Sequence, residues 1–387
     1  MLTTFACSGA PGGKSTVDAV RADAADADAA AGGCVSLPAM TSERPTTLTV
    51  AGEPPGALVR IDPSILWPPE NSSGLLAYSQ SSGPFPHPFA TSVSRSSDAG
   101  ATWQFVAQAN TATPLTITTS DTTLCGSTSC STQLSHEVPS IIVDPSDPDP
   151  SRRYKLFVHA YPMIATASYL VDVGLGYIGL DTSSDGSTWS ADTKVLGWHS
   201  SSTLSSSGAL TDLNADPALA DCAWFTEPGA VIAPSGAIDL VLSCRYSGGV
   251  RLVLMRSTDH AQSFRYVGPL LSSDDARCLG STTGAFIGGD LFYVGAQEYL
   301  LATPMGDGPG LDSLGLFVFP IADAETGALR RDGHGGLVVT RNVVGVDGTK
   351  LVTATYAEGA SAAGYIGFYT PSGGGPPQLF ASGIATP

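Results

Sequence analysis

The sequence predicts an all-β fold, and more narrowly a β-propeller of four-stranded blades. From about residue 50 onward, short runs rich in β-branched and aromatic residues alternate with clusters of Gly, Pro, Asp and Ser, and no stretch shows helical periodicity. Three such runs recur as a unit: an entry strand that begins near Pro or Gly, a hydrophobic second strand, and a third strand that ends in three copies at a Ser-x-Asp turn. Repeated units of this kind are typical of propeller blades that pack around a central channel.

Five copies of the unit are found along the chain, so we expect five blades. The predicted entry strands read RIDPSILW, HEVPSIIVDP, TEPGAVIAP, STTGAFIGG and GGLVVTRNVV. A six-bladed propeller is the alternative, if residues 105–135 or 190–222 form a further blade.

Composition divides the chain into two parts. Residues 1–45 form an Ala/Asp/Gly tract with too little hydrophobicity to fold, and we expect a signal remnant and disordered tether there. Residues 46–387 are expected to form a single propeller domain. The pair Ala6-Cys7 resembles the end of a bacterial lipoprotein signal, although the basic and apolar regions of such a signal are missing. We therefore expect a protein that is secreted or otherwise outside the cytoplasm, with a lipid anchor at Cys7 as one form of attachment.

Charge and cysteine content exclude several classes of function. Only 14% of the 387 residues are charged and the net charge is −17, which disfavours binding to nucleic acid. No apolar run is long enough for a membrane span. We also expect a monomer. No zinc-binding spacing or phosphate-binding loop occurs, so we expect neither a metal nor a cofactor.

Six cysteines remain when Cys7 is set aside, and an even number favours disulfides and an oxidising compartment. Many pairings are possible, and six reduced thiols are the alternative. We expect the three pairs Cys125–Cys130, Cys222–Cys244 and Cys34–Cys278.

The Ser-x-Asp turns carry a family resemblance. SSDAGATW at residues 96–103 matches the Asp-box pattern Ser-x-Asp-x-Gly-x-Thr-Trp at every defined position, SSDGSTW at 183–189 is one residue shorter, and STDHAQSF at 257–264 is degenerate. The chain from about residue 50 thus resembles the Asp-box (BNR-repeat) propellers of the sialidase-like superfamily. The pattern favours a structural role, because Asp98 can accept backbone hydrogen bonds within the turn and Gly100 allows a positive φ. A calcium loop, the alternative, would need more carboxylates.

Three carboxylates start three successive blades, at positions that surround the mouth of a propeller channel. They are Asp62, Glu137 and Glu227. Carboxylates that converge have pKa values pushed apart, so that one acts as an acid while another stays ionised, as glycoside hydrolysis requires. The arrangement is similar to five-bladed glycosidases of the arabinanase, β-xylosidase and invertase type, which implies that Asp62 is the base or nucleophile and Glu227 the general acid. Val138 aligns with Asp62, and Glu137 lies one residue earlier, which on a regular strand would reverse its side chain.

The sialidase resemblance implies a different set of residues. VRIDPSIL is similar to the Arg-Ile-Pro motif, and the segment from Glu227 to Arg245 is similar to the one that carries the glutamate and second arginine of that family. Arg60 and Arg245 would then bind a substrate carboxylate. The third arginine and the tyrosine nucleophile would be Arg341 and Tyr356. Other mouth positions expected to bind substrate are His159, Tyr161 and Tyr246, with Gln297 and Glu298 from the fourth copy.

The sequence therefore predicts a carbohydrate-acting propeller, and specifically a glycoside hydrolase with paired carboxylates at the mouth of its funnel. The alternative is a non-catalytic propeller that binds a glycan or a protein partner, because one fold hosts many functions. In that alternative, Asp and Glu beside Pro cap turns and the arginine forms a structural ion pair.

Overall fold

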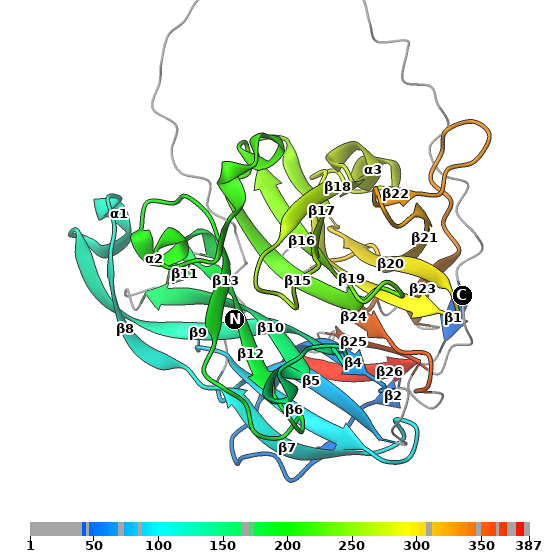
Figure 1. Cartoon of the computed structure of the whole chain (residues 1–387), viewed down its shortest axis with the longest axis horizontal. Coiled ribbons are helices and arrows are strands. Elements are labelled where there is room, and N and C mark those ends of the chain that lie inside the picture. The colour runs from blue at the N-terminus through cyan, green and yellow to red at the C-terminus, as the bar shows by residue number, and fades with distance from the viewer. Residues whose placement is uncertain are drawn as a thin grey trace, which may run out of the picture.

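Five antiparallel sheets surround a central channel in the computed structural model of the chain (Figure 1). The structure describes residues 41–43, 46–68, 73–83, 87–164, 170–171, 173–306, 312–345, 350–360, 364–369 and 377–382. The first strands of the five sheets contact one another in sequence around the channel, and each later strand of a sheet lies farther out. The predicted five-bladed propeller is thereby confirmed.

Each blade is named by its strands, from the channel outward. Blade 1 contains β4 (Val59–Leu66), β5 (Gly74–Ser81), β6 (Ala90–Ser96) and β7 (Trp103–Asn110). Blade 2 contains β9 (Ser129–Val143), β10 (Tyr154–Ile164), β12 (Tyr177–Ser183) and β13 (Thr193–Gly197). Blade 3 contains β15 (Trp224–Ile232), β16 (Ile238–Tyr246), β17 (Gly249–Ser257) and β18 (Arg265–Leu271). Blade 4 contains β19 (Phe286–Val294), β20 (Gln297–Pro304), β21 (Leu316–Asp323) and β23 (Arg341–Gly345). Blade 5 contains β24 (Val352–Tyr356), β25 (Tyr365–Tyr369) and β26 (Gln378–Ser382).

Shorter elements decorate this ring. The added strands are β8 (Thr113–Thr118), β11 (Leu170–Val171), β14 (Thr211–Asp212) and β22 (Ala328–Leu329). The α-helices are α1 (Thr122–Cys125), α2 (Thr203–Ser206) and α3 (Ser273–Cys278). The 3-10 helices are η1 (Pro150–Arg152), η2 (Val173–Leu175), η3 (Leu213–Ala215) and η4 (Pro217–Leu219). None of the helices in the described part of the chain is long and apolar enough to span a membrane.

Strands from the beginning of the chain complete the ring. β2 (Thr46–Thr47) pairs with β26 and supplies the fourth strand of blade 5, so that segments more than 300 residues apart in the sequence share one sheet (Figure 1). β1 (Thr41–Glu43) extends blade 4 beside β23, and β3 (Val50–Ala51) extends blade 1 beside β7.

Two strand assignments in the later copies are wrong. The predicted entry strand of the fifth copy contains β23, which is an outer strand of blade 4, and the entry strand of blade 5 is β24. In the fourth copy, β19 runs through the predicted break between the first two strands. The prediction assumed that all four strands of a blade are consecutive, whereas blade 5 takes one from the N-terminal region. Residues 105–135 and 190–222 form no sixth blade, because β8, β13 and β14 belong to the sheet of blade 2.

The three Ser-x-Asp turns share one hydrogen-bond pattern. In the first, Asp98 Oδ1 accepts from Ser96 Oγ at 2.8 Å and from the Thr102 amide at 2.9 Å, and Gly100 has φ 90°. Asp185 and Asp259 accept the corresponding bonds in the other two turns. The mouth of the channel is the face on which the first strands begin and the second strands end. All three turns join a third strand to a fourth, so they lie on the opposite face.

Hydroxyl groups join neighbouring first strands at three of the five blade interfaces. Ser64 Oγ accepts the amide of Ile141, Ser140 Oγ accepts the amide of Ala230, and Thr355 Oγ1 accepts the amide of Ile65 at 3.0, 2.7 and 3.2 Å. The equivalent positions facing the two interfaces of blade 4 are glycines, Gly229 and Gly289, and a Cβ added at Gly229 would lie 2.4 Å from the Gly289 carbonyl oxygen. Close backbone packing therefore replaces the hydroxyl bridge between blades 3 and 4.

An ion cluster around a fully buried lysine joins blades 2 and 3 on the face opposite the mouth. Lys155 Nζ lies 2.5 Å from Asp147 Oδ2 and 3.5 Å from Asp144 Oδ2, and His260 Nδ1 from blade 3 lies 2.8 Å from Asp144 Oδ2. The two aspartates and the histidine are spaced as ligands of a cation would be. The Lys155 ammonium already supplies the positive charge at this place.

Removing this ammonium is expected to destabilise the fold. We predict that Lys155→Met lowers the free energy of unfolding by about 3 to 5 kcal/mol, because two buried carboxylates lose their fully buried cation and keep only the partly exposed Arg152 and His260. Lys194→Met is the matched control, since Lys194 is partly exposed and donates only to the carbonyls of Leu204 and Ser207. Urea unfolding of the three proteins measures the difference, and a loss no greater than that of the control would contradict the role given to Lys155.

Candidate active site

The same irregularity recurs in the first strands of blades 1 to 3. The ladder between the first and second strands shifts register at Asp62, Val138 and Glu227, and these residues have φ values of 51°, 50° and 56°. Each precedes a proline, and a positive φ is uncommon for any residue other than glycine. Bulges of this kind re-aim side chains, and all three residues line one cavity at the channel.

This cavity is small and acidic. Its volume is about 30 Å³, and its lining includes Asp62, Val138 and Glu227 together with Asp290 from blade 4 and Thr353 from blade 5. A space of this size holds water molecules and no sugar ring. A glycoside would therefore have to approach the carboxyl groups from the mouth.

Asp62 is buried and held by two hydroxyl groups. Its side chain is 6% exposed, Oδ1 accepts from Thr353 Oγ1 at 2.8 Å, and Oδ2 accepts from Ser79 Oγ at 3.3 Å. Burial raises the pKa of Asp62 to about 6, and the two hydroxyl donors oppose that rise.

Glu227 has no such support. The residue is half-buried, but Oε2 is buried and accepts no hydrogen bond from any of the residues that the structure describes. A Cβ added at Gly288 of blade 4 would lie 3.0 Å from Oε2, so the glycine leaves room for this carboxyl group. Burial raises the pKa of Glu227 well above its usual range, and the charges of Asp62 and Glu137 raise it further. Glu227 therefore holds its proton more strongly than Asp62 does.

Glu137 lies beside this pair without lining the cavity. It is half-buried, it faces His159 across the ladder between β9 and β10, and it accepts a hydrogen bond from the Tyr161 hydroxyl. Burial raises the pKa of Glu137 to about 8, the charge of Asp62 adds to the rise, and the Tyr161 hydroxyl opposes it. The bulge at Val138 brings the Glu137 charge within reach of Asp62 and Glu227. The structure thus gathers all three predicted carboxylates.

Two of the predicted substrate-binding residues lie beneath the surface. His159 and Tyr161 are each 1% exposed, and their rings lie 5.0 Å apart. Burial lowers the pKa of His159 to about 3, so its imidazole is neutral. The hydroxyl of Tyr161 is committed to Glu137, and burial raises the pKa of Tyr161 well above its usual value. Both residues are buried beneath the site. The substrate contacts predicted for them stay a prediction.

Arg60 is engaged in an ion pair on the blade 1 side. Its Nε lies 2.9 Å from both carboxylate oxygens of Glu53, and its Nη1 donates to Gln378 at 2.9 Å. Tyr78 donates to the same glutamate at 2.7 Å. This network ties blade 1 to blade 5, and it does not favour the predicted role of Arg60 as a carboxylate-binding residue.

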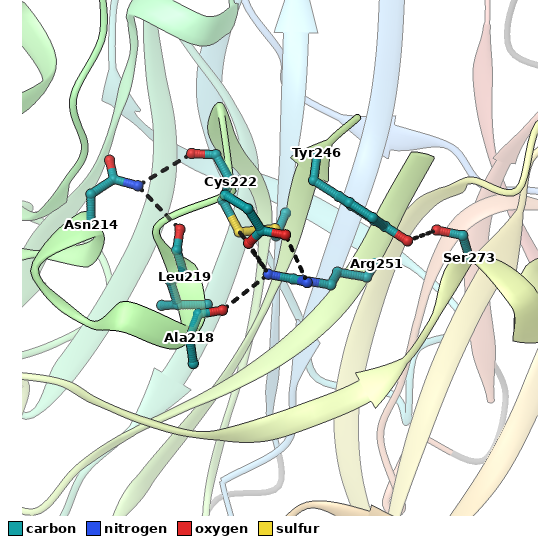
Figure 2. Close-up of a disulfide and its surroundings, with 9 residues drawn as sticks. Asn214, Ala218, Leu219, Cys222, Tyr246, Arg251 and Ser273 are labelled. Atoms are coloured by element: carbon teal, nitrogen blue, oxygen red, sulfur yellow. Dashed lines mark hydrogen bonds and ion pairs between the residues drawn. A yellow bond between two sulfur atoms is a disulfide. The ribbon is translucent and has the colours of Figure 1, made fainter. Parts of the chain in front are cut away.

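At the mouth end of blade 3, a disulfide and the stacked side chains of Tyr246 and Arg251 fix the rim of the channel (Figure 2). Cys222 and Cys244 join the segment before β15 to the end of β16. The Arg251 guanidinium lies 4.9 Å from the centroid of the Tyr246 ring and also pairs with Asp221. The Tyr246 hydroxyl bonds to Ser273 of α3 (Figure 2). Tyr246 is thus fixed in place at the rim.

Arg245 differs from its neighbours at this rim. Its side chain is exposed, and that side chain forms no hydrogen bond or ion pair with any residue in the described ranges. Of the residues predicted to bind substrate, Arg245 is the one that the structure leaves both exposed and unpaired.

Three other predicted residues are placed elsewhere. Gln297 and Glu298 begin β20 after the turn from β19, so they lie on the face opposite the mouth and their predicted position is wrong. Tyr356 is 6% exposed, and its ring packs 4.7 Å from those of Phe292 and Tyr365. A tyrosine inside an aromatic cluster is poorly placed to act as a nucleophile.

Two residues of the cavity are missing from the predicted set. Asp290 follows two glycines in β19, its Oδ1 accepts the Leu291 amide at 3.0 Å, and burial raises its pKa to about 7. Thr353 takes the bulge position of blade 5, with φ 32°. No sequence signal marks Thr353, because the fifth entry strand was assigned to the wrong segment.

The predicted disulfides are confirmed where they can be compared. Cys125 pairs with Cys130 and Cys222 with Cys244. Cys34 and Cys7 lie outside the described residues, so the third pair and the lipid anchor stay predictions. Disulfides are typical of proteins outside the cytoplasm, and the two pairs are consistent with that location.

Comparison with solved structures shows a likeness of fold. No protein-family model matches the sequence, and no curated protein matches it. A family 117 glycoside hydrolase from Zobellia galactanivorans superposes with a TM-score of 0.52 at 13% identity, covering 90% of this chain and 93% of that one. The GH32 β-fructofuranosidase of Bombyx mori gives 0.50 at 15% identity, covering 88% and 62%. A fructofuranosidase from Schwanniomyces occidentalis gives 0.50 at 11% identity, covering 90% and 60%.

These identities show the fold alone. The chain spans about 62% of the length of the Bombyx mori protein, so large parts of that protein have no counterpart in this chain. What the superpositions share is a propeller that supports carbohydrate-acting enzymes.

Proposed function

We propose that this chain is a glycoside hydrolase in which Glu227 is the general acid and Asp62 the base. The observation that carries the proposal is the contrast between two carboxyl groups of one cavity. Asp62 is held by two hydroxyl donors, whereas the buried Oε2 of Glu227 has no hydrogen-bond partner. Two carboxyl groups with opposite protonation at neutral pH are what hydrolysis of a glycosidic bond requires.

The size of the cavity favours a base over a nucleophile. Asp62 is 6% exposed, and the cavity beside it holds water but no sugar ring. A nucleophile must touch the anomeric carbon, whereas a base acts through a water molecule between itself and the sugar. Asp62 therefore activates water, and the reaction inverts the anomeric configuration.

Glu137 acts on Glu227 by its charge. The pKa of Glu137 is about 8, so this group ionises in the alkaline range, and its negative charge there raises the pKa of Glu227 further. Tyr161 fixes Glu137 by its hydrogen bond.

Two wider features of the proposal concern family and location. The shared hydrogen bonds of the Ser96, Ser183 and Ser257 turns support their assignment as Asp boxes. The disulfides support action outside the cytoplasm, as a secreted protein.

A glycoside panel tests the function. The protein is incubated with aryl glycosides of arabinose, xylose, fructose, galactose and sialic acid, and with the corresponding oligosaccharides, and proton NMR follows the first anomer released. We expect turnover of at least one substrate, with inversion. Retention would make Asp62 a nucleophile, and no turnover on any substrate would favour the glycan-binding alternative.

The pH dependence of kcat/KM follows from the two carboxyl groups. Asp62 must be ionised, so activity rises with pH through about 6, the pKa of Asp62. Glu227 must be protonated, and its raised pKa moves the fall in activity to higher pH than an ordinary glutamate would give. We expect a bell with its optimum at neutral pH or above. An optimum below pH 5 would contradict the assignment.

A further inference from the structure

Thr353 occupies the blade 5 counterpart of the position that presents Asp62 and Glu227. The ladder between β24 and β25 shifts register at Thr353, as the ladders of blades 1 and 3 do at their carboxylates. Its φ of 32° is unfavourable for a β-branched residue, and such strain persists only where the surrounding structure holds it. The side chain therefore points to the cavity, which it lines.

The Thr353 hydroxyl is committed to Asp62. Its Oγ1 donates to Asp62 Oδ1 at 2.8 Å, and the two residues are 291 positions apart in the sequence. On the other side of the carboxylate, Ser79 Oγ accepts the Val138 amide at 2.8 Å, which leaves its own hydrogen for Asp62 Oδ2. The Asp62 carboxylate thus accepts hydrogen bonds from hydroxyl groups of blades 1 and 5.

No positive charge lines the cavity among the described residues. The titratable groups that face Asp62 are Glu137 from β9, Tyr161 from β10, Glu227 from β15 and Asp290 from β19, and all of them are neutral when protonated and negative when ionised. Every one of them, when ionised, opposes the ionisation of Asp62. Hydroxyl donors are therefore the groups that favour its charged form.

We propose that Thr353 is the positioning residue that holds the Asp62 carboxylate in place as the base. The catalytic meaning of this step rests on the proposed function, whereas the contact itself does not. Removing the hydroxyl leaves Asp62 with the more distant donor, Ser79. The pKa of Asp62 then rises toward that of Glu227, so the two carboxyl groups differ less in their affinity for a proton.

The test compares Thr353→Val, which keeps the shape and removes the hydroxyl, with Thr353→Ser, which keeps the hydroxyl. Thr91→Val is the matched control, since Thr91 is fully buried in blade 1 and its hydroxyl donates to the His136 carbonyl and does not touch Asp62. We expect Thr353→Val to move the acidic limb of kcat/KM upward by about one pH unit, which lowers kcat/KM about tenfold on that limb. KM should stay within about threefold of the wild type. Thr353→Ser should restore the limb, and Thr91→Val should leave its midpoint unchanged.

Unfolding by urea at a series of pH values gives a readout that needs no activity. The pKa of Asp62 is raised in the folded state, so its contribution to stability is complete at low pH and is lost as pH rises toward about 6. In Thr353→Val this loss should continue to higher pH, and the difference from the wild type should grow between about pH 6, the pKa of Asp62, and about pH 7. For Thr91→Val the difference should not depend on pH.

The two readouts separate the two claims. If Thr353→Val unfolds with the same pH dependence as the wild type, the positioning role is overturned, whatever the activity. If that dependence shifts and the wild type hydrolyses no glycoside, Thr353 still holds Asp62 and the proposed function fails. An unchanged acidic limb in an active Thr353→Val enzyme also overturns the role.

Discussion

Glu227→Gln is expected to lower kcat/KM about a thousandfold for a glycoside with a poor leaving group, within the range known for general acids. Glutamine keeps the shape of the side chain and cannot deliver a proton to the departing oxygen. The loss should shrink to about tenfold or less for an aryl glycoside whose phenol leaves without protonation. Steady-state kinetics on a series of phenols of decreasing pKa measures this dependence.

Glu298→Gln is the matched control for this variant. Glu298 is 3% exposed, and burial raises its pKa to about 7, but it lies on the face opposite the mouth. Its kcat/KM should stay within about threefold of the wild type. An equal loss for good and poor leaving groups in Glu227→Gln would contradict the role of Glu227 as acid.

Asp62→Asn is expected to lower kcat about a thousandfold or more for every leaving group, because water attack loses its base whatever group departs. The amide keeps the volume of the side chain in the buried position. KM should change little, since Asp62 lies beneath the mouth at 6% exposure. Single-turnover and steady-state rates with the best aryl glycoside give the comparison.

Asp290→Asn separates this effect from a general loss of charge in the cavity. Asp290 lines the same cavity, and burial raises its pKa to about 7. We expect a loss of less than about tenfold, because no step depends on its proton. If Asp290→Asn is as inactive as Asp62→Asn, the base is assigned to the wrong carboxyl group or is shared between the two.

Local patterns predicted blades 1 to 3 well. The Ser-x-Asp turns mark the end of each third strand, so they also fix which residues begin the first strands: Asp62, Glu137 and Glu227 were placed together on that ground. Blades 4 and 5 have no such marker. The entry strand of blade 5 was misassigned because β2, about 300 residues earlier in the chain, supplies its fourth strand.

Contacts between distant segments account for the rest of what the sequence did not show. Thr353 meets Asp62 only after the ring closes, and Glu53 meets Arg60 through a turn that no motif marks. Glu137 is the instructive case of register. On a regular strand the Glu137 side chain would face away from that of Val138. The bulge at Val138-Pro139 breaks this alternation and changes the direction of both side chains relative to the channel.

The order in which Asp62 and Glu227 ionise tests the account most directly. Carbon-13 NMR of carboxyl-labelled protein, with the two signals assigned by Asp62→Asn and Glu227→Gln, follows each group through a pH titration. We expect Asp62 to titrate near pH 6 and Glu227 to keep its proton well beyond that point. A Glu227 signal that titrates in the ordinary range of a glutamate, or before Asp62, would contradict the assignment of acid and base.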